Sequence, residues 1–183
     1  MAMSMKATKV VTGKARLSFA HVWEPASVNG SNPKYSASVI IPKHDIDTIT
    51  RINAAIEAAI TEGIGKFGGK KPNKAALKLP LRDGDTDRPD DEAYKDSYFI
   101  NCNSTTAPQI VDRSVQPILD REEVYSGCYV RVSINFYAYN SSGNKGIAAG
   151  LGNIQKIADG EPLGGKTNAR DEFSSLDDDD FLN

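Results

Sequence analysis

This chain of 183 residues has few of the side chains that build metal centres and disulfide frameworks, with only two cysteines and two histidines. Cys102 and Cys128 do not form a close-spaced pair, and no histidines gather near them. We therefore expect two buried, reduced thiols and neither a disulfide nor a zinc site. His21 and His44 have no evident nucleophile partner, which argues against acid–base or triad catalysis. No cofactor and no metal are predicted.

Long apolar runs are also lacking. No stretch approaches the roughly 18 apolar residues that a membrane-spanning helix needs. The N-terminus carries Lys6 and Lys9 but not the apolar core and cleavage site of a signal peptide. No membrane partner is therefore predicted, and the expected location is the cytoplasm.

Positive charge is missing from the C-terminal end. Residues 171–183 contain six acidic residues and no lysine or arginine, whereas the first 82 residues contain 13 basic and 5 acidic residues. The net charge of −2 thus hides a basic body, which favours a polyanionic partner. Periodicity also stops at residue 159, where Gly, Pro, Asn, Ser and Asp dominate. We predict one domain over residues 1–158 and a disordered linker and acidic tail over residues 159–183.

Two-residue alternation of apolar and polar side chains predicts that most of the domain is β-sheet. Strands are expected over residues 14–23, 34–41, 98–103, 108–111, 127–139 and 146–157. Turn and loop residues fill 24–33, 79–92 and 141–145. One helix is predicted, capped by Asp45, with apolar residues at helical spacing up to Ile60 and with Gly63 and Gly65 ending it. This order predicts a small barrel or curved sheet with one inserted helix.

The strand over residues 127–139 carries the main functional signal. Its even positions are apolar and form a core row, whereas its odd positions include Tyr129, Arg131, Tyr137 and Tyr139. Aromatic rings on an outer face can stack nucleic-acid bases, and each stacked base contributes about 1–3 kcal/mol. Tyrosine also favours strands for packing reasons, so a covering sheet or helix is the structural alternative.

Basic side chains are available to hold a phosphate backbone beside these rings. They are Lys14 and Arg16 on the first predicted strand, Lys34 at the start of the second, and Lys70, Lys71 and Lys74 in one loop. A lysine-rich loop also serves solubility. Trp23 ends the first strand, where it either stacks a base or plugs the end of the barrel.

The acidic tail ends in an apolar tip. The charged block is Asp177, Asp178, Asp179 and Asp180, and Phe181 and Leu182 follow it. A tail kept only for solubility has no need of such a tip. Carboxylates and a ring imitate the phosphates and base of a nucleic-acid strand, and they can also dock into a basic, apolar pocket of a partner.

Two other patterns are weak. Asp83, Asp85 and Asp87 have the alternate spacing of a calcium loop, but Arg88 and Tyr94 stand where such a loop needs glycine and glutamate. The Gly-rich stretch before the tail, GEPLGGKT, matches the phosphate-loop pattern. No helical periodicity follows it, and a phosphate loop needs a helix there, so we interpret the match as chance.

Five segments agree in order and spacing with one known family. They are residues 12–18 (TGKARLS), 75–85 (AALKLPLRDGD), 125–129 (YSGCY), 135–140 (NFYAYN) and 150–156 (GLGNIQK). The chain resembles, from about residue 8 to the tail, the single-stranded DNA-binding proteins encoded by tailed bacteriophages and prophages. The resemblance implies an OB fold and an acidic tail with a terminal aromatic residue. Phe181 matches that ring, but Leu182 and Asn183 follow it, which departs from the pattern.

The expected function is non-catalytic, sequence-independent binding of single-stranded DNA in phage replication, recombination or repair, in the cytoplasm of the bacterial host. Replication or recombination proteins are the expected partners of the tail, which would also compete with DNA. Two alternatives stay open. One is a metal-dependent nuclease that uses the carboxylates of residues 83–92. The other is a phage structural or interaction protein whose tyrosine face forms an oligomer interface, for example in a homodimer.

Overall fold

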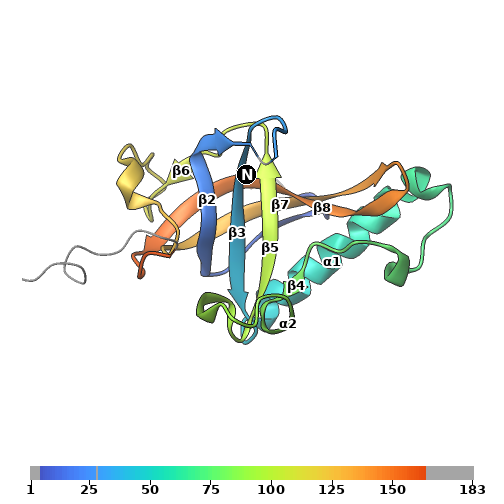
Figure 1. Cartoon of the computed structure of the whole chain (residues 1–183), viewed down its shortest axis with the longest axis horizontal. Coiled ribbons are helices and arrows are strands. Elements are labelled where there is room, and N and C mark those ends of the chain that lie inside the picture. The colour runs from blue at the N-terminus through green and yellow to red at the C-terminus, as the bar shows by residue number, and fades with distance from the viewer. Residues whose placement is uncertain (1–4, 28, 164–183) are drawn as a thin grey trace, which may run out of the picture.

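The computed structural model describes residues 5–27 and 29–163, and in this part of the chain five long strands close into a barrel (Figure 1). They are β2 (Ala15–Ala26), β3 (Lys34–Pro42), β5 (Ser97–Ser104), β7 (Tyr129–Ser141) and β8 (Asn144–Ala158). Antiparallel pairing joins β2 to β3, β3 to β5, β8 to β7 and β7 to β2. Parallel pairing of Asn103 with Gly150 joins β5 to β8. This closed order is that of the five-stranded Greek-key OB barrel, so the predicted mainly β, OB-fold-like class is confirmed.

Short elements extend the barrel. The strands are β1 (Lys9–Val11) beside β7, β4 (Arg82–Asp83) beside β5 and β6 (Ile110–Val111) beside β8. The helical segments are α1 (Ile46–Glu62), α2 (Gly84–Asp87) and the 3₁₀ turns Ile64–Phe67, Lys74–Ala76, Glu92–Tyr94 and Arg121–Glu123. In the described residues, no helix combines the length and apolarity needed to cross a membrane.

The core lies inside the barrel and under α1. The even positions of β7, from Val130 to Ala138, are at most 5% exposed, as the alternation predicts. Helix α1 packs its apolar face against the barrel, with Ile52 and Ile60 fully buried. The predicted cap is confirmed, because the Asp45 side chain accepts a hydrogen bond from the Thr48 amide. The helix ends at Glu62, and Gly65 lies in the 3₁₀ turn that follows.

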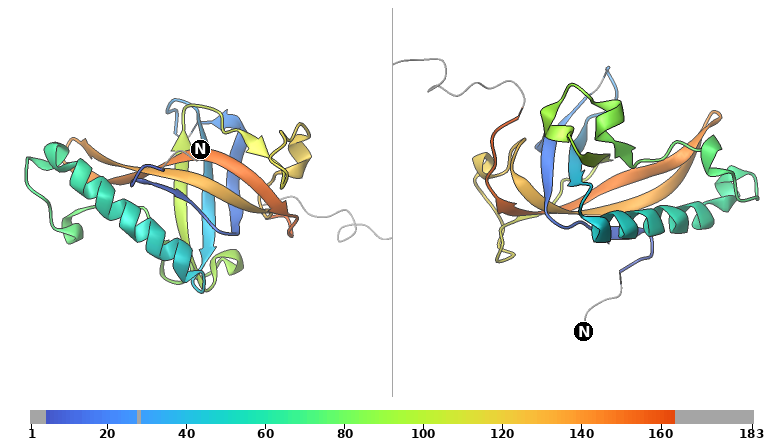
Figure 2. Two further views of the ribbon diagram at one scale, coloured as in Figure 1. Left: turned by 180° about the vertical axis from the view of Figure 1, so that it is seen from behind. Right: turned by 90° about the horizontal axis from the view of Figure 1, so that it is seen from below.

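Strands β7 and β8 continue beyond the barrel as a two-stranded arm, and α1 runs along the same side (Figures 1 and 2). The segment after α1 is tied to this arm. The Lys66 ammonium donates to the Ala138 carbonyl (3.1 Å), and the Asn140 side-chain amide donates to the Lys66 carbonyl (3.0 Å). The arm ends in a tight turn at Ser142 and Gly143, both with positive φ, which matches the strand twist.

Several predicted turns are shorter than the composition suggested. Strand β2 reaches Ala26, which pairs with Lys34 after irregular pairing in the middle of the strand. The expected turn over 141–145 is confined to its two central residues, and the expected loop over 79–92 contains β4 and α2. Local composition marks turn-forming residues but not the pairing partner that extends a strand.

After β8, the described chain continues to Leu163 and remains in contact with the barrel. The Arg16 guanidinium donates to the Glu161 carbonyl (2.7 Å), and the Leu163 amide donates to the Ser126 carbonyl (2.9 Å). Residues 159–163, which we predicted to begin the linker, therefore pack on the domain. The tail residues Asp177, Asp178, Asp179, Asp180, Phe181 and Leu182 lie outside the described residues.

Candidate nucleic-acid interface

A shallow trough runs over the outer face of β8. Its floor is formed by the small residues Gly146, Ala148 and Gly150 of this face. The neighbouring strands provide larger side chains on both sides. Tyr137 and Tyr139 of β7 stand opposite Ala148 and Gly146, and Asn103 of β5 stands beside Gly150. We define the β8 trough as Gly146, Ala148, Gly150, Tyr137, Tyr139, Asn101 and Asn103.

Gly146 permits the close packing that shapes the rim of this trough. A Cβ atom there would lie 2.4 Å from the Lys78 carbonyl oxygen and 2.8 Å from the Tyr139 hydroxyl oxygen. Without it, the Lys78 amide donates to the Lys145 carbonyl (3.0 Å) and the Ile147 amide donates to the Lys78 carbonyl (2.9 Å). The segment from Lys78 to Arg82 is therefore held beside β8, and a cleft of about 530 Å³ lies between it and the β8 trough.

The chemistry of this cleft suits a flexible polyanion with flat bases. Lys78 and Arg82 are exposed, and Asn101 and Asn103 present amides from β5. Tyr137 is 43% exposed although it is a large ring. Tyr139 lines this cleft, and Tyr137 stands next to it, opposite Ala148. Together, the rings, amides and cations can stack bases and hold phosphates. OB barrels bind oligonucleotides on their second and third strands and on the hairpin between the last two strands, which here are β3, β5 and the arm.

Below the trough, the loop over residues 82–96 is fixed to the barrel by one lysine. The Lys43 ammonium contacts Asp83 Oδ1 (2.9 Å) and Asp85 Oδ2 (2.8 Å). The hydrogen bonds from Lys43 lower the pKa of both carboxyl groups below their ordinary value and raise the pKa of Lys43 itself. Asp85 also accepts the Asp96 amide (3.0 Å), which joins the two ends of the loop.

Acid is expected to loosen this loop. The pKa values of Asp83 and Asp85 are lower in the folded protein than in the unfolded chain. Their contribution to the stability of the loop is therefore complete above about pH 4, and it is lost as the pH falls through their pKa values in the folded protein. Protection of the Asp96 amide against hydrogen exchange, followed by NMR, should fall only below about pH 4. In a Lys43→Met variant, the onset should move to higher pH. An onset that is the same in both proteins would contradict the role given to Lys43.

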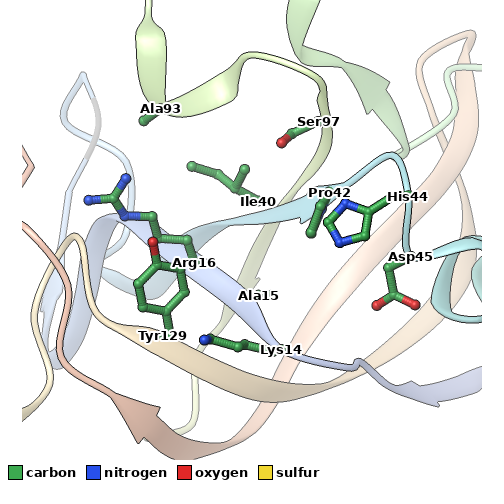
Figure 3. Close-up of a pocket in the computed structure, with 10 residues that line it drawn as sticks. All are labelled: Lys14, Ala15, Arg16, Ile40, Pro42, His44, Asp45, Ala93, Ser97 and Tyr129. Atoms are coloured by element: carbon green, nitrogen blue, oxygen red, sulfur yellow. The ribbon is translucent and has the colours of Figure 1, made fainter.

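The predicted site residues Lys14, Arg16 and Tyr129 gather in a different cleft of about 620 Å³, at the opposite end of β7 from the arm (Figure 3). The Lys14 ammonium lies 4.7 Å from the centre of the Tyr129 ring, and the Arg16 guanidinium carbon lies 5.6 Å from it. Arg16 is also engaged with the backbone, because it donates to the Gly127 carbonyl (3.0 Å) as well as to Glu161. Its guanidinium holds the C-terminal segment on the barrel.

Three further predicted residues lie apart from both clefts or are engaged in the fold. The Arg131 guanidinium donates to the Thr12 carbonyl (3.1 Å), and the Trp23 indole donates to the Val124 carbonyl (2.9 Å). Trp23 also packs against the core. Of the two roles considered for it, base stacking and closing the end of the barrel, this packing corresponds to the second. Lys34 is exposed where β3 begins.

The predicted basic loop lies beside α1 near the arm. Lys70, Lys71 and Lys74 are all exposed, and Lys71 and Lys74 form ion pairs with Glu57 of the helix. The predicted alternation of buried and outward side chains along β7 is confirmed. The three outward tyrosines do not form one site, however, because Tyr137 and Tyr139 border the β8 trough and Tyr129 lines the cleft at the other end of the strand.

Sequence reasoning missed Asn101, Asn103 and Ala148 as candidate site residues. Their signal is present in the strand alternation, since amides take the outward positions of β5 and small residues take those of β8. The alternation does not reveal that these two strands lie side by side. That neighbourhood arises from the parallel pairing of Asn103 with Gly150.

Four of the six carboxylates of residues 83–92 form ion pairs with basic side chains. Besides the two partners of Lys43, Asp87 pairs with Arg82 (3.0 Å) and Asp91 pairs with Arg88 (3.2 Å). Within residues 5–27 and 29–163, no three His, Cys, Asp or Glu side chains gather as a potential metal site. These four carboxylates contact basic side chains within or next to the loop over residues 82–96.

Together, the barrel topology and the β8 trough define an OB-fold protein with a candidate site for an oligonucleotide. Residues 8–182 match the family described as Enterobacter phage Enc34, ssDNA-binding protein. The chain belongs to this family of phage single-stranded DNA-binding proteins.

Individual relatives agree with this membership. Putative protein p50 of Acyrthosiphon pisum secondary endosymbiont phage 1 is 33% identical over 175 residues, which cover 92% of this chain and 94% of the relative. The solved single-stranded DNA-binding protein from bacteriophage Enc34, in complex with ssDNA, is 27% identical with a TM-score of 0.75, and the match covers 87% of this chain and 91% of that one. The structure of gp2.5, a single-stranded DNA-binding protein of bacteriophage T7, is 14% identical with a TM-score of 0.61. The match covers 91% of this chain and 94% of that one, and it shows a likeness of fold.

Proposed function

We propose that this protein binds single-stranded DNA without sequence preference and without catalysis. The β8 trough is the observation that carries the proposal, because it combines exposed rings, outward amides and neighbouring cations on the face that OB barrels use for oligonucleotides. Family membership supports it, as does the bound ssDNA in the structure of the Enc34 protein.

The proposed DNA path crosses the strands. It begins on the arm at Tyr137 and Tyr139, passes the amides of β5 and continues over β3 towards β2. Ser36 of β3 pairs with Asn103 on one side and with His21 of β2 on the other, so their outward side chains form one row. Lys78 and Arg82 lie at the rim of the path, and the lysines of the loop over residues 68–74 lie beside α1, near the arm.

Salt is expected to weaken binding strongly. Release of counterions from single strands gives a slope of about −0.7 per phosphate contact in a plot of log affinity against log salt. With about five contacts, raising monovalent salt from about 50 to 200 mM should lower the affinity roughly 100-fold. A fluorescence competition titration with unlabelled oligo-dT measures this change, and Lys78→Gln should make the slope shallower by about 0.7.

Two controls accompany this titration. One measures binding of duplex DNA of the same length, and the other incubates the oligonucleotide with magnesium to test for cleavage. Much weaker binding of the duplex is expected because its bases are not available to the rings. The oligonucleotide should stay intact after incubation with magnesium. Binding that is absent at low salt, or equally tight for the duplex, would contradict the proposed function. Cleavage that is lost in Asp85→Ala would instead support the nuclease alternative.

The biological setting follows from the same proposal. We propose that the protein covers DNA exposed during phage replication, recombination or repair. We further propose that the acidic tail, residues 171–183, binds replication or recombination proteins and competes with DNA for the basic surface. Removal of the tail should then tighten DNA binding, most clearly at low salt. Pairing with a second copy of the chain stays a prediction.

A further inference from the structure

A second exposed aromatic ring lies on β2, far from the arm. Phe19 is 55% exposed and has a φ of 47°, a backbone conformation that few residues other than glycine adopt. It lies at an irregularity of β2, where two residues stand between the pairs Ser18–Ser38 and His21–Ser36. The Ser126 hydroxyl accepts the Ala20 amide (2.9 Å) and helps to hold this bulge. The bulge therefore turns a large apolar ring towards solvent.

An arginine supports one side of this ring. The Arg88 guanidinium carbon lies 4.9 Å from the centre of the Phe19 ring and 4.7 Å from the centre of the Tyr94 ring. Asp91 pairs with Arg88 and limits its movement. Tyr94 is fully buried, so the stack of Tyr94, Arg88 and Phe19 is anchored in the fold at one end and ends in an exposed ring at the other.

The exposed ring borders a cleft of about 370 Å³. His21, Asp91, Ser126 and Leu163 also line it. Asp91 is the acidic side chain among them, and its charge is offset by Arg88. The cleft offers an aromatic face, an imidazole and a hydroxyl, which are groups that stack and hydrogen-bond a base.

This cleft lies in line with the proposed DNA path. His21 pairs with Ser36, Ser36 pairs with Asn103, and Asn103 pairs with Gly150 of the trough. Three strand-to-strand steps separate β2 from β8, which corresponds to about 14 Å at the usual strand spacing. A DNA strand that crosses the face from the arm therefore reaches Phe19 within a few nucleotides.

We propose that the free face of the Phe19 ring is a base-stacking platform, at the end of the DNA interface opposite the arm. This role rests on the proposed function. A strained and exposed aromatic residue is costly to the folded state, and such positions are concentrated at ligand sites. A base stacked on Phe19 would continue the column of Tyr94, Arg88 and Phe19.

The test uses the full chain, oligo-dT and four variants, with thermal unfolding measured in parallel. Phe19→Gly should bind about 5- to 150-fold more weakly, because one stacked base is lost. Its Tm should be equal to or higher than that of the parent, because glycine adopts a positive φ without strain. Phe19→Leu should bind as weakly as Phe19→Gly, and Phe19→Tyr should bind like the parent. Phe19→Trp should show DNA-dependent quenching beyond that of the native Trp23.

Salt dependence separates stacking from charge effects. The slope of log affinity against log salt should be unchanged in Phe19→Gly, because a stacking residue releases no counterions. If the parent binds and Phe19→Gly binds within twofold of it, the platform is wrong and the proposed function stands. If Phe19→Leu restores binding, the ring acts by covering Arg88 and not by stacking. If the parent does not bind, the proposed function itself fails.

Discussion

Ala148→Glu is expected to weaken oligo-dT binding on the order of 100-fold, which corresponds to about 3 kcal/mol. Ala148 lies on the floor of the β8 trough, opposite Tyr137 and between two glycines of the same strand face. A glutamate there fills the space that a base needs and places a carboxylate beside the phosphates. The side chain of Ala148 is partly exposed and points away from the core, so the fold should tolerate the longer side chain.

Ala54→Glu is the matched control for this experiment. Ala54 is exposed on α1, outside the trough, and the substitution changes the net charge by the same amount. If both variants lose the same affinity, the effect arises from net charge, and the trough is not the interface. If Ala148→Glu binds like the parent, the proposed path over β8 is wrong.

Tyr94→Ala is expected to lower the free energy of unfolding by about 3–5 kcal/mol. The Tyr94 ring is 0% exposed and packs edge-on against Phe99, with the ring centres 5.0 Å apart. Its hydroxyl donates to the buried Ser38 hydroxyl (2.9 Å), and its ring also contacts Arg88. The substitution leaves a cavity beneath the loop over residues 82–96. Urea denaturation followed by circular dichroism measures the change.

Tyr94→Phe separates packing from hydrogen bonding. It keeps the ring, so its cost should be limited to about 1–2 kcal/mol, for the lost bond and the unpaired hydroxyl of Ser38. A Tyr94→Ala variant that unfolds with the parent's midpoint would show that the loop does not depend on this side chain. Because Tyr94 also supports Arg88 beneath Phe19, DNA affinity should fall in Tyr94→Ala even under conditions where the variant is fully folded.

Strand and helix positions followed from the sequence wherever one face is buried. The apolar row from Val130 to Ala138 has a period of two because one face of β7 meets the core, and the isoleucines of α1 have helical spacing for the same reason. Asp45 and Gly63 acted as caps through local hydrogen bonds, which depend on neighbours in sequence. Strand β1 was not predicted because three residues are too few to show a period.

Side-chain partners were not predictable in the same way. Arg16 looked like a phosphate ligand, yet it donates to carbonyls of Gly127 and Glu161, more than a hundred positions away in the chain. Lys71 and Lys74 looked free for DNA, yet both reach Glu57. A basic residue has the same appearance in a sequence whether its charge faces solvent or a partner.

The sequence by itself determined the β-rich domain, its single long helix, the inward and outward faces of β7, the division into a basic body and an acidic tail, and the resemblance to phage single-stranded DNA-binding proteins. These properties depend on local periodicity and composition. Only the tertiary structure decided which outward residues become neighbours. Closure of the barrel places the amides of β5 beside the glycines of β8 and separates Tyr129 from Tyr137 and Tyr139, because contacts between distant strands depend on their order and register around the barrel.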